Sequence, residues 1–196
     1  MTVPLGGDSS SCTPFNSTFH GNGYTIKHLN LNNASYMHSA LFCNMVGATV
    51  ENLVFDATCS FTGSFSGALS VAVGDQVSVI NVTNKAKVIG NDAAGGLIGF
   101  VSGSARQSLL IDNCVNDGRI VNNNAYAGGF IGRIYQSQNR EVIITNSINK
   151  GTITSLTSSG GFIGGIVDDL NKKTTENIRV TFFEQFKQRQ RHKFEH

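Results

Sequence analysis

The apolar residues of this chain occur in short, β-branched runs that are bounded by glycine, asparagine and serine. Such runs predict β-strands and tight turns rather than helices. One run recurs as a phrase, Gly-Gly-Leu/Phe-Ile-Gly, and its copies contain Gly96 and Gly99, Gly129 and Gly132, and Gly161 and Gly164. Two looser copies precede it, so that equivalent positions fall at residues 40, 68, 96, 129 and 161, with steps of 28, 28, 33 and 32 residues.

A second recurring phrase lies between the glycine phrases and carries two asparagines three positions apart. The first asparagine recurs with steps of 29, 32 and 33 residues, which are close to the glycine steps. Because two unlike phrases recur with nearly the same changes in spacing, they indicate a structural repeat. The first asparagine series is Asn52, Asn81, Asn113 and Asn146, and the second is Asn84, Asn116 and Asn149.

A period near thirty residues predicts short units that bury their apolar faces only by stacking on one another. Three strands of about five residues with their bends fill one unit, so we expect an all-β parallel solenoid with three sides and about five coils. Stacked strands lie about 4.8 Å apart, a spacing at which asparagine amides bond to the asparagines above and below. We therefore predict turn and stacking roles for both asparagine series, and sharp bends or close backbone contacts at the repeated glycines.

The composition agrees with a β-rich chain that has a polar but weakly charged surface. Of the 196 residues, 40% are hydrophobic and 14% are charged, against about 25% charged residues in typical soluble domains. Both prolines, Pro4 and Pro14, precede the repeats, as expected for strands that use every backbone donor. We expect a flexible segment over residues 1–14, β-helix repeats over 15–170, and a basic tail or cap over 171–196.

Charge separates this tail from the body of the chain. Residues 171–196 contain seven basic and three acidic residues, whereas the first 170 contain eight basic and ten acidic residues. No nucleic-acid-binding motif accompanies the basic residues, so we expect a solvated end and no nucleic-acid partner. Residues 187–194 have helical propensity, and either form a short capping helix or belong to the end of a truncated larger protein. No apolar run approaches 18 residues, so no transmembrane segment is predicted.

The four cysteines, Cys12, Cys43, Cys59 and Cys114, lack the paired spacing of a zinc site. Two interpretations stay open, namely buried free thiols, or a disulfide between Cys43 and Cys59 if the chain is secreted. No metal, other cofactor or catalytic residue is predicted.

Parallel solenoids also include polysaccharide-degrading enzymes, whose sites gather carboxylates on one face. No acidic column is expected here, because Asp112 aligns with Ile80 and Thr145 in the neighbouring units. Tyr126 and Tyr135, with Tyr36, are expected at the surface, where they contact a sugar or a protein partner. Ten other aromatic residues are assigned to stacking in the core: Phe15, Phe19, Tyr24, Phe42, Phe55, Phe61, Phe65, Phe100, Phe130 and Phe162.

The glycine phrase resembles the GLUG motif of bacterial and protist surface proteins, and Gly96-Leu97-Ile98-Gly99 matches the defining pattern of that motif. The segments from Phe15 to Leu29 and from Gly47 to Leu53 also resemble the sequences that lead into such repeats. The resemblance covers roughly residues 15 to 168. It implies a right-handed parallel β-helix in large extracellular, adhesin-like proteins, some of which carry a separate protease domain, and it transfers no catalytic residue.

We therefore expect a non-catalytic β-solenoid segment of an extracellular or cell-surface protein, which binds a host or cell-surface protein or a glycan. The open ends of the solenoid would also allow end-to-end self-association. One alternative is a polysaccharide lyase or glycoside hydrolase on the same scaffold. Another is an ice-binding protein, although Thr152 and Thr154 are replaced by Arg119 and Val121 one unit earlier.

Overall fold

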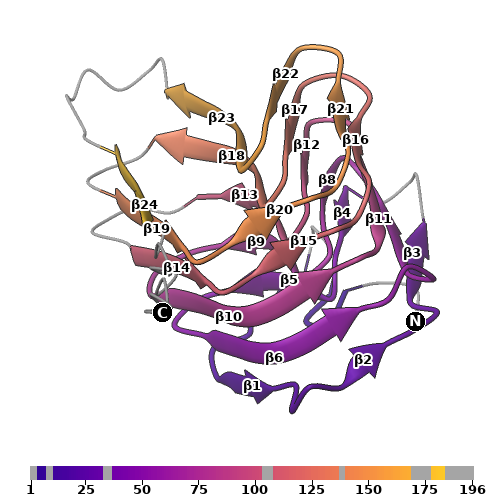
Figure 1. Cartoon of the computed structure of the whole chain (residues 1–196), viewed down its shortest axis with the longest axis vertical. Coiled ribbons are helices and arrows are strands. Elements are labelled where there is room, and N and C mark those ends of the chain that lie inside the picture. The colour runs from indigo at the N-terminus through magenta and orange to yellow at the C-terminus, as the bar shows by residue number, and fades with distance from the viewer. Residues whose placement is uncertain are drawn as a thin grey trace, which may run out of the picture.

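The computed structural model describes residues 4–7, 11–32, 37–102, 108–136, 140–168 and 178–183. Every regular element in this part of the chain is a β-strand, and every strand pair is parallel. The strands stack into a β-solenoid of about four turns (Figure 1). The all-β parallel solenoid is thus confirmed, whereas the count of about five coils is not. The expected carboxy-terminal helix lies outside the described residues.

Four sheets run along the solenoid, and we number them I to IV in the order in which the chain enters them. Sheet I contains β1 (Thr18–His20), β2 (Thr25–Ile26), β6 (Thr49–Phe55), β10 (Val77–Asn84), β14 (Ser108–Asp112), β15 (Val115–Asn116), β19 (Arg140–Thr145), β20 (Ile148–Asn149) and β24 (Ile178–Phe183). Sheet II contains β3 (Asn30–Asn32), β7 (Ser60–Thr62), β11 (Lys87–Gly90), β16 (Ile120–Asn122) and β21 (Ile153–Ser155).

Sheets III and IV come from the glycine phrases. Sheet III contains β4 (His38–Ser39), β8 (Phe65–Gly67), β12 (Ala93–Gly95), β17 (Tyr126–Gly128) and β22 (Ser158–Gly160). Sheet IV contains β5 (Phe42–Met45), β9 (Ser70–Val73), β13 (Ile98–Val101), β18 (Ile131–Gln136) and β23 (Ile163–Asp168). The two sheets meet at a sharp angle in Figure 1, and only two residues separate β12 from β13.

Residues one repeat apart lie directly over each other and build the core as columns. In sheet I the inward column is Val50, Val79, Ile111 and Ile144, and each of these side chains is at most 2% exposed. Burying each such side chain contributes about 1.5–3 kcal/mol relative to leaving it in water. In the inner layers each strand is flanked by equivalent strands, so its backbone donors and acceptors are satisfied by the layers above and below.

The expected three-sided cross-section is wrong, because the chain forms four sheets per turn. The glycine phrase divides what would be one side into two short strands that meet at a re-entrant corner. At this corner the outer faces of sheets III and IV turn toward each other. The side chains that reveal this arrangement are Phe65 of β8 and Phe100 of β13, whose ring centroids lie 5.0 Å apart.

The glycines are required at this corner because backbone atoms occupy the places of their side chains. Gly67, Gly95, Gly128 and Gly160 form one column in sheet III. A Cβ atom on Gly128 would lie within 3.0 Å of the Ile131 carbonyl and the Gly164 amide. The last glycine of the phrase makes the reciprocal contact, since a Cβ on Gly132 would lie 2.8 Å from the backbone nitrogen of Ala94, one layer away.

The amino-terminal segment packs against the free edge of sheet IV. Leu5 and Phe15 form parallel bridges with Phe42 and Met45 of β5, on the side away from β9. The Phe15 ring stacks on the Phe42 ring with a centroid distance of 4.5 Å. The described part of residues 1–14 therefore extends the stack below the first layer.

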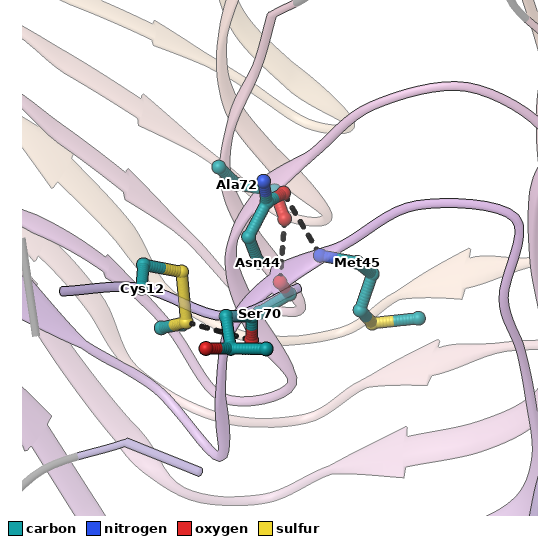
Figure 2. Close-up of a disulfide and its surroundings, with 7 residues drawn as sticks. Cys12, Asn44, Met45, Ser70 and Ala72 are labelled. Atoms are coloured by element: carbon teal, nitrogen blue, oxygen red, sulfur yellow. Dashed lines mark hydrogen bonds between the residues drawn. A yellow bond between two sulfur atoms is a disulfide. The ribbon is translucent and has the colours of Figure 1, made fainter. Parts of the chain in front are cut away.

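A disulfide joins this segment to the first layer. Cys12 is bonded to Cys43 of β5, with a Cα–Cα distance of 6.0 Å, and Figure 2 shows Cys12 beside the β5–β9 pair, where Asn44 and Ala72 are register partners. The alternative Cys43–Cys59 disulfide is therefore wrong as a prediction. Cys43 bonds instead to Cys12, which lies in the amino-terminal segment that pairs with β5. The free-thiol interpretation is confirmed for Cys59 and Cys114, which are both buried.

Two glycines at the same position of the repeat provide a matched test of the corner. A Cβ on Gly129 would lie within 3.0 Å of the Gly161 carbonyl and the Asn149 amide, whereas a Cβ on Gly161 meets no atom within 4 Å. We predict that Gly129→Ala lowers the free energy of unfolding by about 1–3 kcal/mol, as overpacking does. Gly161→Ala, the control, should leave it unchanged or slightly raised. Urea unfolding of both variants measures the difference, and equal losses would contradict the proposed corner geometry.

The disulfide closes a chain loop with a sequence separation of 31 residues. We predict that Cys12→Ser lowers the free energy of unfolding by about 2–4 kcal/mol, because the unfolded chain regains the freedom that the cross-link removes. Thermal unfolding with and without dithiothreitol checks this. The reductant should destabilise the native chain and leave the Cys12→Ser variant unaffected, and sensitivity of that variant to the reductant would contradict the assignment.

Candidate functional site

The first asparagine series forms a column on the outside of sheet I. Asn52, Asn81, Asn113 and Asn146 all have positive φ angles, between 50° and 57°, a conformation that asparagine tolerates better than most residues. Asn81 Nδ2 donates to Asn52 Oδ1 at 2.7 Å, and Asn113 Nδ2 donates to Asn81 Oδ1 at 3.4 Å. The ladder then shifts, because Asn146 Nδ2 donates to Asp112 Oδ1 at 2.9 Å. Asn52 and Asn81 lie within β6 and β10, and Asn113 and Asn146 separate β14 from β15 and β19 from β20, so this column marks a bend within sheet I.

The second series forms a shorter, buried ladder. Asn84 Nδ2 donates to Asn116 Oδ1 at 2.9 Å, and Asn116 Nδ2 donates to Asn149 Oδ1 at 2.8 Å. Asn84 and Asn116 are fully buried. Each ladder member also bonds to its own turn; for example, the Ala86 amide donates to Asn84 Oδ1 at 2.9 Å. The buried ladder therefore satisfies polar groups that water does not reach.

The repeated glycines lie at the re-entrant corner between sheets III and IV, and the side chains on its outer faces form a cluster. We call this the corner cluster and define it as Phe65, Phe100, Tyr126, Arg133 and Tyr135. The Phe100 and Tyr135 rings meet edge to face with centroids 6.0 Å apart. The cluster draws on β8 and β17 of sheet III, and on β13 and β18 of sheet IV.

Arg133 is the centre of the corner cluster and is only 9% exposed. Its guanidinium carbon lies 4.1 Å from the ring centroid of Tyr135, 5.3 Å from that of Phe65 and 5.5 Å from that of Tyr126. One terminal nitrogen donates to the Tyr135 hydroxyl. The Nε atom is buried without a hydrogen-bond acceptor.

The electrostatics of Arg133 are unusual because its charge lacks a carboxylate partner among the described side chains. The described residues contain one ion pair, in which exposed His20 Nδ1 lies 2.7 Å from Glu51 Oε1. Cation–π contacts of about 0.5–2 kcal/mol each offset part of the cost of burying an arginine. They do not supply an acceptor for Nε, whose burial without one is costly.

Sequence reasoning placed part of this cluster correctly. Tyr126 and Tyr135 lie on the outside of the solenoid, half-buried, as expected. The core assignment of Phe65 and Phe100 is wrong, because both face outward at the corner, and Tyr24 is 76% exposed. Arg133 was not identified from the sequence, although a charged residue in register with Phe100, inside the repeat, is a signal that could have found it. Tyr36 lies outside the described residues, as do positions 103–107 and 137–139.

Two other titratable groups, Cys114 and Asp56, have shifted pKa values. Burial raises the pKa of the Cys114 thiol to about 12, so this thiol is protonated and unreactive at neutral pH. Hydrogen bonds from the backbone and side chain of Thr58 lower the pKa of Asp56, an exposed turn residue. Within the described ranges, no three His, Cys, Asp or Glu residues gather as a metal site would require. The same part of the chain holds no helix of the length and apolarity that a membrane span needs.

Comparisons with known proteins identify the scaffold only. No protein-family model and no curated protein sequence matches the chain. Among solved structures, the chain is similar to a crystal structure from Bacteroides ovatus described as a "putative immunoglobulin A1 protease", with a TM-score of 0.55 and 16% sequence identity. The match covers 83% of this chain and 61% of the other. At this identity the similarity shows the fold alone, and the chain spans less than two thirds of that structure's length.

The buried ladder gives a further stability prediction. Asn116→Ala removes the acceptor of Asn84 Nδ2 and the donor to Asn149 Oδ1, and should lower the free energy of unfolding by about 2–4 kcal/mol because buried polar groups lose their partners. Asn149→Ala removes one ladder bond at a less buried position and should cost about half as much. Chemical denaturation measures both values, and a smaller loss for Asn116→Ala than for Asn149→Ala would contradict the ladder's role.

Proposed function

We propose that this chain is a non-catalytic, adhesin-like binding module of an extracellular or cell-surface protein, and that the solenoid displays the corner cluster to a glycan or protein partner. The observation that carries this proposal is the corner cluster itself. It places half-buried aromatic rings, and a largely buried arginine that has no carboxylate partner among the described side chains, at the corner of a repetitive scaffold. Aromatic residues and arginine are the side chains that most often anchor binding interfaces.

Two further features support the extracellular setting. The Cys12–Cys43 disulfide belongs to oxidising compartments, since cytosolic thiols are kept reduced. The resemblance of the glycine phrase to the GLUG motif of surface proteins supports the same setting.

Exposed apolar residues near the last described layer, such as Leu156 and Phe182, support end-to-end association with a second solenoid.

A carbohydrate- or protein-cleaving enzyme is the second candidate, favoured by the name of the similar Bacteroides structure. The distribution of acidic residues weighs against it. Asp112 lies in register between Ile80 and Thr145, so no column of carboxylates forms around it. The ice-binding alternative is weaker still, because Thr154 lies in register with Val121, which lies over Ile89, so its threonine array does not continue.

One experiment separates these candidates. The oxidised, folded chain is applied to a glycan array and to immobilised cell-surface proteins, and the same preparation is screened for cleavage of polysaccharides and of immunoglobulin A. We expect saturable binding without turnover, and no binding by the chain after reduction and thermal unfolding. If the chain cleaves a substrate, and a single substitution such as Asp112→Asn abolishes the cleavage, the chain is an enzyme and the proposed binding module is wrong.

A further inference from the structure

We propose that the corner cluster is a binding site for a carboxylate-bearing oligosaccharide, with Arg133 as the residue that pairs with the acidic group. This inference rests on the proposed function, because it names the ligand class of the same module. It follows from three independent features of the cluster, which are its charge, its aromatic faces and its position in the repeat.

The positive charge of the cluster favours an anionic ligand. Arg133 is nine-tenths buried, and its Nε lacks an acceptor, so the guanidinium retains hydrogen-bonding capacity that no described side chain uses. The planar guanidinium favours carboxylate, which it binds through two parallel hydrogen bonds. Tyr135 holds one terminal nitrogen through its hydroxyl and stacks beneath the guanidinium, which fixes the orientation of the group.

The aromatic faces call for a ligand with apolar surfaces as well as charge. Tyr126, Tyr135, Phe65 and Phe100 are all half-buried, so each ring presents part of its surface to solvent. An amphipathic ring with a polar rim, such as a sugar, matches apolar faces flanked by a tyrosine hydroxyl. A small inorganic anion would leave these faces unused.

The position of the cluster indicates an extended ligand. Phe65 lies in β8 and Tyr135 in β18, and these strands are separated by the β12–β13 layer. The two residues are thus two layers apart, or roughly 10 Å along the solenoid axis. Both rings reach toward the Arg133 guanidinium, so the cluster spans the edges of three layers, and an oligosaccharide that lies along the corner can contact rings from more than one layer.

The residues in register with Arg133 show how other layers fill this position without an arginine. Its column contains Asn44, Ala72 and Phe100 below and Gly165 above. The equivalent positions in the two neighbouring layers, Phe100 and Gly165, therefore carry no charge. A Cβ on Gly165 would meet the Tyr126 ring, so the layer above Arg133 leaves room for that ring.

The test is isothermal titration of the oxidised chain with trigalacturonic acid, its fully methyl-esterified neutral form, and sodium sulfate. We expect the acid to bind at least about tenfold more tightly than the ester, and sulfate to bind weakly. Arg133→Met should weaken binding of the acid about ten- to hundredfold. Arg119→Met is the matched control, since Arg119 is exposed beside sheet II, and it should leave binding unchanged. Equal affinities for acid and ester, equal losses in the two variants, or no binding of the acid would overturn the inference.

A second measurement guards against misfolding of Arg133→Met. In the wild-type chain, the Nε–Hε resonance of Arg133 should shift on titration with trigalacturonic acid, and Arg133→Lys, which keeps the charge but not the planar fork, should weaken binding about tenfold. An unshifted resonance would overturn the inference. A different outcome is that the glycan array shows saturable binding of neutral glycans that Arg133→Met does not affect. In that case the proposed binding module is retained, and the proposed carboxylate site at Arg133 is wrong.

Discussion

The close approach of two backbones at the re-entrant corner is the constraint on which the rest of this structure depends. Gly128 and Gly132 belong to one phrase, and each faces a backbone atom of another strand where a side chain would otherwise stand. Without that approach, the chain could not pass from sheet III to sheet IV in two residues. The same approach turns two outer faces toward each other, so the repeat that forms the scaffold also creates the surface that holds the corner cluster.

The two asparagine columns have different structural roles, although they lie only three residues apart in the sequence. Asn81 takes a left-handed backbone conformation at the outside of sheet I, where the side-chain ladder adds to a bend that the backbone already requires. Asn116 lies in the core, where an amide without partners would be costly. Its ladder is therefore complete on both sides, whereas the outer ladder shifts to Asp112 where solvent supplies alternative partners.

How far the fold follows from the sequence depends on whether a feature repeats. The stacking of Asn84 over Asn116, and of Gly95 over Gly128, follows from the nearly equal steps of the two phrases, and the structure shows both pairs in register. The number of sides of the solenoid does not follow from the sequence, because the two-residue corner interrupts the alternation of inward and outward residues. For that reason Phe65 and Phe100 were placed in the core. The cysteine pairing depends on an amino-terminal segment outside the repeat, and spacing alone gives no information about its path.

Departures from the repeat are therefore the places where function can be separated from scaffold. A column in a solenoid needs residues that stack, and Phe100 meets this need one layer below Arg133 without any charge. Replacing such a residue by arginine costs desolvation that three aromatic rings only partly offset. The exchange adds a hydrogen bond to the Tyr135 hydroxyl, but it leaves Nε without an acceptor among the described side chains. A ligand that brings a carboxylate to the guanidinium gives the exchange a physical reason, because it supplies the acceptor that the described chain lacks.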